Sequence, residues 1–284
     1  MGRMKSRVKR SSARRARRSR AARAPKRRPR AAVHPALAAA VKAARAAGEI
    51  ALKYYRGGFK VTIKPDQTPV TQADQEAEQA IIAILQRAFP DYGFLGEEFG
   101  EQGAQETRWI VDPIDGTKNF VRHIPIWAVL VALEENGEVT TGVVFNPVTG
   151  ELFSARRGEG AFVNGERISV SGCDHMTDAT VLHADLRYLR ATPHWDGFLR
   201  LSAAGYRTRG FGDYYGYGLV AQGRAEIYVE VDLKPWDVAP VKILVEEAGG
   251  RLTDFTGKPT IYDGTVLATN GRLHAEALAL LRGA

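Results

Sequence analysis

Apolar side chains recur every three or four residues in two segments of the N-terminal half. This spacing places them on one face of a helix and predicts amphipathic helices over residues 34–56 and from Thr71 to Pro90. A Gly-Gly pair ends the first segment, and Pro90 ends the second. Asp74 follows Thr71 by three residues, so we expect Thr71 to cap the second helix.

Short apolar stretches separated by turn residues dominate the middle of the chain. Asn136-Gly137 and Asn164-Gly165 are typical of hairpins, because Asn and Gly tolerate the positive φ of a primed turn. The short spacing between strands favours an antiparallel sheet over crossover units. The predicted strands are residues 60–64, 108–112, 128–133, 141–145, 152–155, 161–163 and 168–170.

The last third of the chain mixes both periodicities. We expect an amphipathic helix over residues 238–248, ended by Gly249-Gly250. The other predicted elements are helices over 194–204, 216–222 and 273–281, and strands over 225–231, 251–254 and 266–269. Residues 92–106 (YGFLGEEFGEQGAQE) are predicted to form a loop. Together, the predicted helices and strands indicate a fold in which helices pack on sheets in layers.

Charge divides the chain into two parts. The formal net charge is +8, but residues 1–31 hold 15 of the 40 Lys and Arg residues and no acidic residue. Residues 32–284 therefore carry 25 basic and 32 acidic side chains. The basic segment lacks the apolar surface that would offset its ordering entropy. We therefore expect a disordered tail over residues 1–31 and one folded domain over residues 32–284.

Three interpretations of the basic tail stay open. It is an arm that contacts nucleic acid or another polyanion, or an Arg-, Ser- and Ala-rich targeting peptide. The third interpretation is that it has no role, as a passive extension or as the result of a start codon assigned too early. A secretory signal is not expected, because no apolar core of about 7–15 residues follows the charges.

The remaining composition narrows the class of protein. No apolar run approaches the roughly 18 residues that span a bilayer, so a membrane protein is not expected. The single cysteine, Cys173, cannot form an intrachain disulfide, which fits a reducing, cytoplasmic compartment. We expect Cys173 to be structural, and the six histidines show no metal-ligand spacing.

The candidate chemistry begins in residues 111–120 (VDPIDGTKNF). Asp112 and Asp115 lie three residues apart at the end of a predicted strand, where layered α/β folds tend to bind ligands. Pro113 keeps Asp112 extended, so this carboxylate is held in one direction. The two acids and the Ile114 carbonyl are oxygen ligands of the kind that Mg²⁺ prefers.

The next residues are suited to an anion. Thr117 is placed to cap a short helix that begins at Lys118, and free N–H groups at such a start bind phosphate. The sequence therefore suggests a metal site facing a phosphate. An Asp-Pro turn followed by a helix cap, without any chemistry, is the alternative.

Two further acidic stretches are ambiguous on their own. Glu97, in Gly-Glu-Glu, is either a ligand or part of a solvated loop. Asp237, after Pro-Trp, is either a ligand or an ordinary N-cap of the helix that follows.

Taken together and in this order, GEE, WIVDPIDGTKNF and PWDVAPVKILVEEAGGRLTD resemble the magnesium-dependent inositol monophosphatase family. The resemblance covers residues 35–284 and leaves only the tail outside. It implies an α+β fold, a layered αβαβα sandwich of the sugar-phosphatase type. It also implies a small phosphorylated substrate and a homodimer.

The resemblance also implies a ligand set for two to three Mg²⁺ ions. One ion would be held by Glu97, Asp112 and the Ile114 carbonyl, and a second by Asp112, Asp115 and Asp237. Glu97 would also help to hold a third, weaker ion. Without cations, the two aspartates of the motif are expected to repel each other.

The same resemblance assigns the phosphate and the proton transfers. Gly116 and Thr117 would cradle the phosphate through backbone N–H groups and the Thr hydroxyl. Asp74 matches the family's acid that hydrogen-bonds this threonine, and it can cap its helix at the same time. Two ions would clamp the attacking and leaving oxygens, while Thr117 with Asp74 or Glu97 accepts a proton from the attacking water.

The substrate prediction rests on a second set of residues. Lys118 and GDYYGYGLVAQGRAE (residues 212–226) are similar to the histidinol-phosphate phosphatase branch, whereas inositol-specific relatives more often show Thr and a Gly-Thr/Ser-Ala run. Histidinol phosphate carries an ammonium and an imidazole. Asp213 and Glu230, with Asp232 nearby, would contact these cations.

Each of these acids has an alternative interpretation. Asp213 would otherwise be a turn residue, and Glu230 an exposed charge on a strand. Glu230 stands seven residues before Asp237, where the family has a substrate-binding glutamate.

The sequence thus predicts a Mg²⁺-dependent histidinol-phosphate phosphatase of histidine biosynthesis. An inositol-1-phosphatase or a broader sugar-phosphate phosphatase is the nearest alternative. A protein that binds nucleic acid or another polyanion through its basic tail is the alternative from another class.

Overall fold

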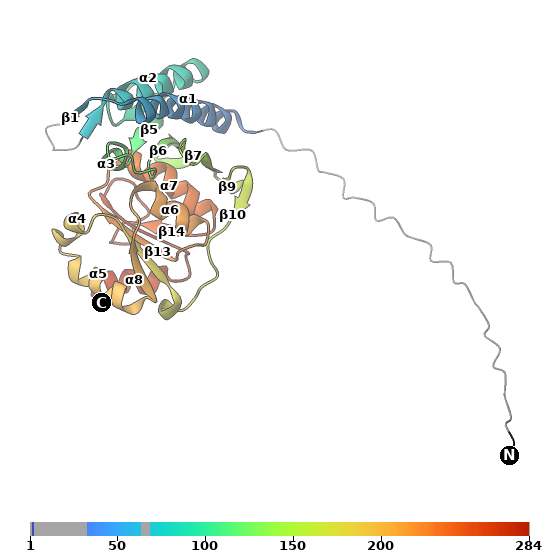
Figure 1. The fold of residues 1–284 in the computed structure, drawn as a ribbon, viewed down its shortest axis with the longest axis vertical. Coiled ribbons are helices and arrows are strands. Elements are labelled where there is room, and N and C mark those ends of the chain that lie inside the picture. Colours follow the sequence, from blue (N-terminus) through green and yellow to red (C-terminus); the bar gives the residue numbers. More distant parts are fainter. Residues whose placement is uncertain (1, 3–32, 64–68, 284) are drawn as a thin grey trace. The chain divides into compact units, whose positions relative to one another are not determined.

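The computed structural model describes residues 2, 33–63 and 69–283. The chain divides into two units after Ala32. The predicted disordered tail lies, apart from Gly2, outside the described residues. The second unit carries all the helices and strands of the described chain (Figure 1).

The first layer of the fold is a pair of helices. α1 (Pro35–Gly57) and α2 (Gln72–Ala88) bury alanine-rich faces against each other and against the first sheet, which confirms both predicted helices. The short strands β1 (Val61–Ile63) and β2 (Pro69–Thr71) pair antiparallel between them. Thr71 caps α2 as predicted: its Oγ1 accepts the Ala73 N–H at 3.1 Å, and Asp74 accepts the Thr71 N–H at 2.8 Å.

The second layer is a sheet of eight strands among the described residues. Its order is β10-β9-β8-β7-β6-β5-β3-β4, and every pair except β3–β5 is antiparallel, as the short connections predicted. The strands are β3 (Gly93–Gly96), β4 (Gly100–Gln102), β5 (Thr107–Asp115), β6 (Ala128–Glu135), β7 (Glu138–Asn146), β8 (Glu151–Arg156), β9 (Gly160–Val163) and β10 (Glu166–Ile168).

Local turn chemistry was a better guide in this sheet than strand periodicity. Asn136 and Asn164 have φ of 54° and 50° and each precedes a positive-φ glycine, which confirms both hairpins. The loop predicted over residues 92–106 is wrong, because β3 and β4 lie in it. These glycine-rich strands show no apolar alternation and are defined by their pairing with β5 and with each other. β10 also lies two residues before its predicted start.

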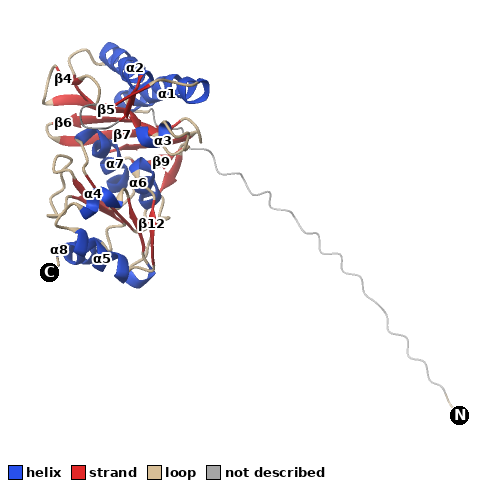
Figure 2. Ribbon diagram, turned by 60° about the vertical axis from the view of Figure 1, so that its left-hand side comes forward, coloured by secondary structure: helices blue, strands red, loops and turns tan. Residues whose placement is uncertain are grey.

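A helical layer separates the two sheets (Figure 2). α7 (Pro235–Glu247) packs against the first sheet and β14, beside α6 (Asp213–Ala221). The prediction that α7 is amphipathic is wrong: residues 238–245 are all buried, since sheets lie on both sides. α6 begins three residues earlier than predicted.

The remaining layers are a five-stranded sheet, counted over the described residues, and helices on its far face. Its order is β12-β11-β13-β15-β14, and β11 runs parallel to both neighbours. The strands are β11 (Thr180–His183), β12 (Arg207–Gly210), β13 (Ile227–Val231), β14 (Arg251–Thr253) and β15 (Thr265–Thr269). Among the outer helices, α5 (Trp195–Ala204) and α8 (His274–Arg282) were predicted, whereas α4 (Leu186–Arg190), β11 and β12 were not. The five layers confirm the αβαβα sandwich.

The site depends on how closely α7 approaches the first sheet. Gly142 of β7 faces α7, and a Cβ added there would lie 2.4 Å from Ile243 Cγ2 and 2.7 Å from the Pro240 carbonyl oxygen. Only glycine allows this approach without a shift of α7, which carries Asp237 into the site.

We therefore expect Gly142→Ala to lower the free energy of unfolding by about 1–3 kcal/mol through overpacking. The measurement is urea-induced unfolding of both proteins. Gly172→Ala is the matched control, because nothing lies within 4 Å of a Cβ added at Gly172. Equal stability of all three proteins would contradict the close packing of α7 on β7.

Candidate active site

The candidate site lies at the end of β5, where the strand carries a β-bulge. Asp112 pairs with Leu130 and Asp115 with Ala128, so β5 has one residue more than its partner β6 over this interval. In a regular strand, residues three apart point to opposite faces. The extra residue of the bulge brings the side chains of Asp112 and Asp115 to the same side of the sheet.

Three carboxylates meet at this bulge. Each of Asp112, Asp115 and Asp237 offers one oxygen, and these oxygens lie within 4.8 Å of one another. These oxygens are close enough together to bind one metal ion. All the donors are oxygen atoms, which hard divalent cations prefer. The residues therefore fit a divalent metal centre.

Backbone N–H groups hold each of these carboxylates in place. Asp112 accepts the Ile114 N–H at 2.8 Å, Asp115 the Tyr214 N–H at 2.7 Å, and Asp237 the Lys234 N–H at 2.7 Å. In each case the bond uses one carboxylate oxygen. The other oxygen of each group remains available to a cation.

Burial, together with the neighbouring negative charges, raises the pKa values of the cluster. Burial, followed by the charges of Glu97, Asp115 and Asp237, raises the pKa of Asp112 well above its usual range. Burial, followed by the charges of Asp213 and Asp237, does the same for the pKa of Asp115. Burial also raises the pKa of Asp237 to about 7. A bound cation would remove this repulsion.

The structure corrects the local prediction for Asp237. This residue is not the N-cap of α7, since Lys234 takes that position and Asp237 is the third residue of the helix. Pro235 is the first helical residue, a position that suits proline because no N–H is needed there. The Asp237 carboxylate reaches back to the cap and still faces the cluster.

Glu97 lies in the turn between β3 and β4 and lines the same pocket as the three aspartates. It is half-buried, and its charge acts on Asp112 and Asp237. Glu97 is therefore part of the site, although its carboxylate stands outside the tight group of three.

The segment after the bulge turns sharply into α3 (Thr117–Phe120). Gly116 is the N-cap and has a left-handed conformation with φ of 84°. The prediction that Thr117 caps this helix is wrong, because the turn at Gly116 makes Thr117 the first helical residue. Its hydroxyl donates to the Ile114 carbonyl at 3.0 Å. The Asn119 N–H already donates to the Gly116 carbonyl at 2.8 Å. The N–H groups of Thr117 and Lys118 precede this first helical hydrogen bond and are open to an anion.

Asp74 is fully buried in the first turn of α2. Its Oδ2 accepts both the N–H and the hydroxyl of Thr71, at 2.8 and 2.6 Å. The expected hydrogen bond between Asp74 and Thr117 is absent from the described part of the chain, where the Thr117 hydroxyl is bound to Ile114. Burial raises the pKa of Asp74 to about 7, a value suited to proton exchange near neutral pH.

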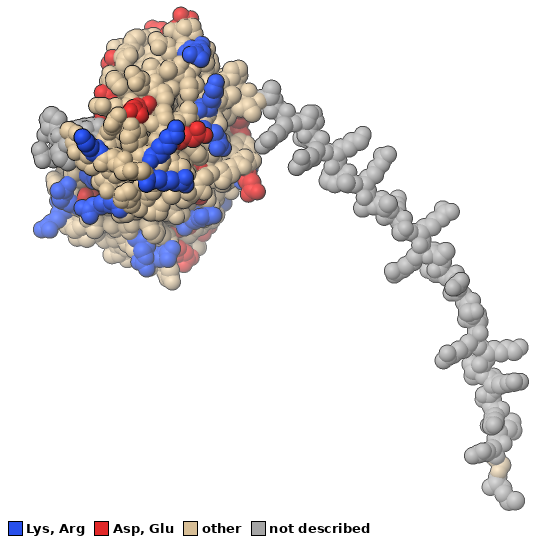
Figure 3. Space-filling view, turned by 45° about the horizontal axis from the view of Figure 1, so that its top comes forward, with Lys and Arg blue, Asp and Glu red and all other residues tan. Residues whose placement is uncertain are grey.

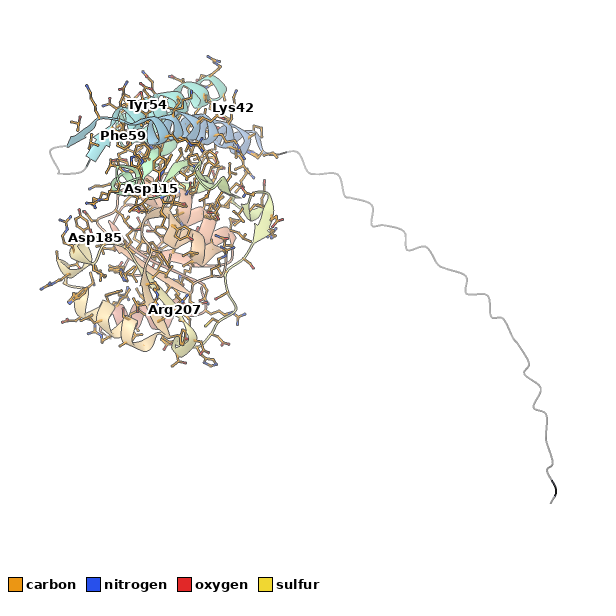
Figure 4. The ribbon with its side chains drawn as sticks, viewed as in Figure 1. Lys42, Tyr54, Phe59, Asp115, Asp185 and Arg207 are labelled. Carbon is orange, nitrogen blue, oxygen red and sulfur yellow. The ribbon has the colours of Figure 1, made fainter. Side chains whose placement is uncertain are left out.

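The pocket has a volume of about 440 Å³ and is strongly acidic. Its described lining contains eight carboxylates and one cation, Lys118. The face of the domain drawn in Figure 3 shows basic and acidic side chains interspersed. Asp185 lines the pocket from the second sheet's side, and Figure 4 labels it together with Asp115.

Asp213 and Asp232 line the pocket from strained backbone positions. Their φ values are 56° and 65°, which non-glycine residues rarely adopt. Asp213 is the first residue of α6 rather than a turn residue, and its Oδ2 accepts the Asn119 side-chain N–H at 2.8 Å. Burial raises the pKa of Asp213 to about 6, and the Lys118 charge opposes this shift.

The burial of Glu230 rules out the alternative that it is an exposed charge on a strand. Only 8% of it is exposed, and its Oε2 has no well-aligned hydrogen-bond partner among the described residues. The buried hydroxyls of Tyr217 and Tyr228 lie beside the carboxylate and partly oppose the effect of burial, which raises its pKa to about 8. Glu230 is therefore a buried acceptor at the wall of the pocket.

Sequence reasoning missed Glu78, Asn119, Asp185 and Tyr188. Glu78 is fully buried on α2, and its carboxylate contacts the turn that carries Glu97. One signal was present: Glu78 falls on the same helical stripe as Ile81 and Leu85, where an apolar residue is expected.

The layered fold, the three clustered carboxylates and the helix start with open N–H groups are features of a metal-dependent phosphate monoester hydrolase. The comparisons with known proteins place the chain in this class. The chain belongs to the inositol monophosphatase family, whose sequence profile matches residues 32–284. This family is generally metal-dependent, in agreement with the three-aspartate cluster.

Three relatives illustrate the similarity. A histidinol-phosphatase of Chlorobaculum parvum is 43% identical over 239 residues, which are 83% of this chain and 92% of that protein. An inositol-1-monophosphatase of Mesorhizobium japonicum is 38% identical over 220 residues, which are 75% of this chain and 82% of that protein. The structure of this chain matches the crystal structure of the extragenic suppressor protein SuhB of Bartonella henselae with a TM-score of 0.80 and 34% sequence identity. The match covers 88% of this chain and 99% of that chain.

The charge of Asp237 can be tested without a substrate. The pKa of Asp237 rises from 3.8 in the unfolded chain to about 7 in the folded one, so the folded state holds the proton more tightly. The contribution of this group to the free energy of unfolding is therefore fully present below about pH 4 and is lost as pH rises through 7. In chelator we therefore expect Asp237→Asn, which preserves the Lys234 contact, to lose less stability than the parent between pH 4 and about 8. The measurement is thermal unfolding with and without Mg²⁺.

Asp91→Asn, at an exposed position after α2, is the control for a simple loss of charge. The Asp237 variant should also gain less stability from added Mg²⁺ than the parent and this control. A variant that follows the parent at every pH and gains the full Mg²⁺ stabilisation would contradict the assignment of Asp237 to the metal centre.

Proposed function

We propose that the protein is a Mg²⁺-dependent histidinol-phosphate phosphatase, which hydrolyses L-histidinol phosphate to L-histidinol and phosphate. The observation that carries the proposal is the excess of carboxylates in the pocket. Beyond Glu97 and the aspartate cluster, four more acids line it, namely Asp185, Asp213, Glu230 and Asp232. A substrate with positive charge at the end away from its phosphate fits this wall.

The donor set supports Mg²⁺ as the ion. Glu97, Asp112 and the Ile114 carbonyl would hold one ion, Asp112, Asp115 and Asp237 a second, and Glu97 would help a third. The Ile114 carbonyl has a second lone pair beside the one that the Thr117 hydroxyl occupies. Bound ions would supply electrostatic stabilisation of the phosphoryl group and a water of lowered pKa.

The chain's own residues would bind the phosphate and move the proton. The N–H groups of Gly116 and Thr117 lie at the sharp turn beside the cluster and would hold the phosphate oxygens. Glu97 or Asp74 would accept the proton of the attacking water, with Thr117 Oγ1 as the relay. For this relay the Thr117 hydroxyl would turn from the Ile114 carbonyl to the carboxylate. The raised pKa of Asp74, about 7, supports its part in this transfer.

A second group of acids in the pocket, close to the aspartate cluster, would bind the substrate's cations. The Glu230 carboxylate is buried beside the Tyr217 and Tyr228 hydroxyls, and its Oε2 has no well-aligned partner among the described residues. A ligand ammonium or imidazole N–H would supply an aligned hydrogen bond. Asp213 would make the second contact from the start of α6. The similarity to the Chlorobaculum parvum histidinol-phosphatase supports this choice of substrate.

An inositol-1-phosphatase is the second candidate, supported by the Mesorhizobium japonicum relative. A homodimer belongs to the proposal on the strength of the family resemblance. A cytoplasmic location belongs to it because the single cysteine fits a reducing compartment. No helix in residues 33–63 or 69–283 is long and apolar enough to cross a membrane. A polyanion-binding role of the basic tail rests on residues outside the described part of the chain.

Asp213→Asn tests the substrate assignment. Asparagine tolerates the positive φ and can still accept from Asn119, so the variant removes mainly the charge. Loss of one charge-assisted hydrogen bond should lower kcat/KM for histidinol phosphate by about 10- to 100-fold. Hydrolysis of p-nitrophenyl phosphate, which has no cationic group, should change much less.

The kinetics of the parent decide between the candidates. Histidinol phosphate should be the preferred substrate when compared with inositol 1-phosphate and fructose 1,6-bisphosphate. Preference for inositol 1-phosphate, or equal losses on both test substrates in Asp213→Asn, would overturn the proposed substrate while leaving the phosphatase class intact.

A further inference from the structure

Glu78 is a buried carboxylate that makes no contribution to the chemistry described above. It lies on α2 one helical turn after Asp74 and is fully buried. Its two oxygens accept two successive backbone N–H groups, Oε2 that of Glu98 at 2.9 Å and Oε1 that of Phe99 at 3.1 Å. Both donors belong to the turn that presents Glu97.

The turn packs closely against the Glu78 carboxylate. Gly96, the last residue of β3, has no side chain, and a Cβ added there would lie 1.9 Å from Glu78 Oε1. Gly96 pairs with Val111 of β5 and with Gly100 of β4. Residues 97–99 thus form a tight connection that is held at both strands and, in its centre, by the Glu78 carboxylate.

This connection fixes Glu97 relative to the aspartate cluster. The Glu97 N–H donates to the carbonyl of Val111 at 3.3 Å, and Val111 directly precedes Asp112. The next two N–H groups are held by Glu78. Three consecutive backbone contacts therefore determine the position from which the Glu97 side chain enters the pocket.

A carboxylate can hold a surface turn in the same way, as Glu247 does, but Glu78 is fully buried. Burying a carboxylate is costly, and a short turn can satisfy its N–H groups with water or with a neutral acceptor. The Glu78 carboxylate holds the two backbone N–H groups that directly follow Glu97, and the Glu97 charge acts on it. Carboxylates behind a metal ligand orient that ligand in this way.

We propose that Glu78 is a positioning residue, which holds the turn of residues 97–99 so that the Glu97 carboxylate faces Asp112, and thereby sets the affinity of the site for divalent cations. It touches neither substrate nor metal and acts through Glu97. The inference rests on the proposed function, in that it assigns a role to the same metal site.

Glu78→Gln tests this role with little change in shape. The amide has one acceptor oxygen in place of two, so one of the two N–H groups loses its partner. We expect Mg²⁺ to bind about 10-fold more weakly, measured by isothermal titration of the full-length protein with Mg²⁺ alone. The Mg²⁺ concentration for half-maximal hydrolysis of p-nitrophenyl phosphate should rise in parallel, with kcat near the parent value at saturating Mg²⁺.

Glu247→Gln is a matched control for the loss of a bidentate contact. The Glu247 carboxylate also accepts two backbone N–H groups, from Gly158 at 2.8 Å and Gly160 at 2.7 Å, in a turn that does not line the pocket. This variant should lose thermal stability in the same way as Glu78→Gln. Its Mg²⁺ affinity should equal that of the parent.

A double-mutant cycle with Glu97→Gln separates positioning from a general weakening of the fold. If Glu78 acts through Glu97, adding Glu78→Gln to Glu97→Gln should weaken Mg²⁺ binding no further. Gly96→Ala perturbs the same contact from the side of the turn, should Glu78→Gln fold poorly. It should shift the Mg²⁺ affinity in the same direction.

Two results would overturn the inference alone: Mg²⁺ binding by Glu78→Gln equal to that of the parent, or an equal loss in the presence and absence of Glu97. A parent protein that binds no Mg²⁺ at all would instead overturn the proposed metal-dependent function, and the positioning role of Glu78 with it.

Discussion

Buried negative charge at the end of β5 is the constraint on which the rest of the site depends. Asp112, Asp115 and Asp237 bring oxygens within 4.8 Å of one another, although like charges at this distance disfavour ionisation of the whole group. Backbone N–H groups hold one oxygen of each acid and compensate only part of the charge. The arrangement is stable as a fully ionised site only when cations are bound between the acids.

The layered fold supplies this partial compensation from its central helices. α6 provides the Tyr214 N–H to Asp115, and α7 carries Asp237 in its first turn. Both helices therefore begin at the acidic cluster, where the partial positive charge of a helix start favours anions. The glycine at position 142 lets α7 lie close to the first sheet, so a packing feature far from the chemistry helps to set the position of a ligand.

Local signals predicted the elements that depend on neighbours in sequence, and failed for those that depend on distant partners. The capping box of α2 and the two Asn-Gly hairpins were predicted because their physics lies within a few residues. The burial of α7 on all sides is caused by two sheets that meet it only in the fold. The aspartate cluster was expected from a family resemblance, whereas Glu78 was missed because a helical glutamate is usually solvated.

The same constraint accounts for the acids beside the cluster. Glu230 is buried, with Tyr217 and Tyr228 beside it but no well-aligned partner for its Oε2 among the described residues. Asp213 and Asp232 occupy strained backbone positions in the same pocket. Unsatisfied buried acceptors and strained residues persist where a ligand supplies what the protein leaves out. Cations would complete the aspartate cluster, and a positively charged substrate group would complete the neighbouring group of acids. Selectivity for a cationic phosphate ester would then arise from the requirement that governs metal binding, because both groups of buried acids need positive charge.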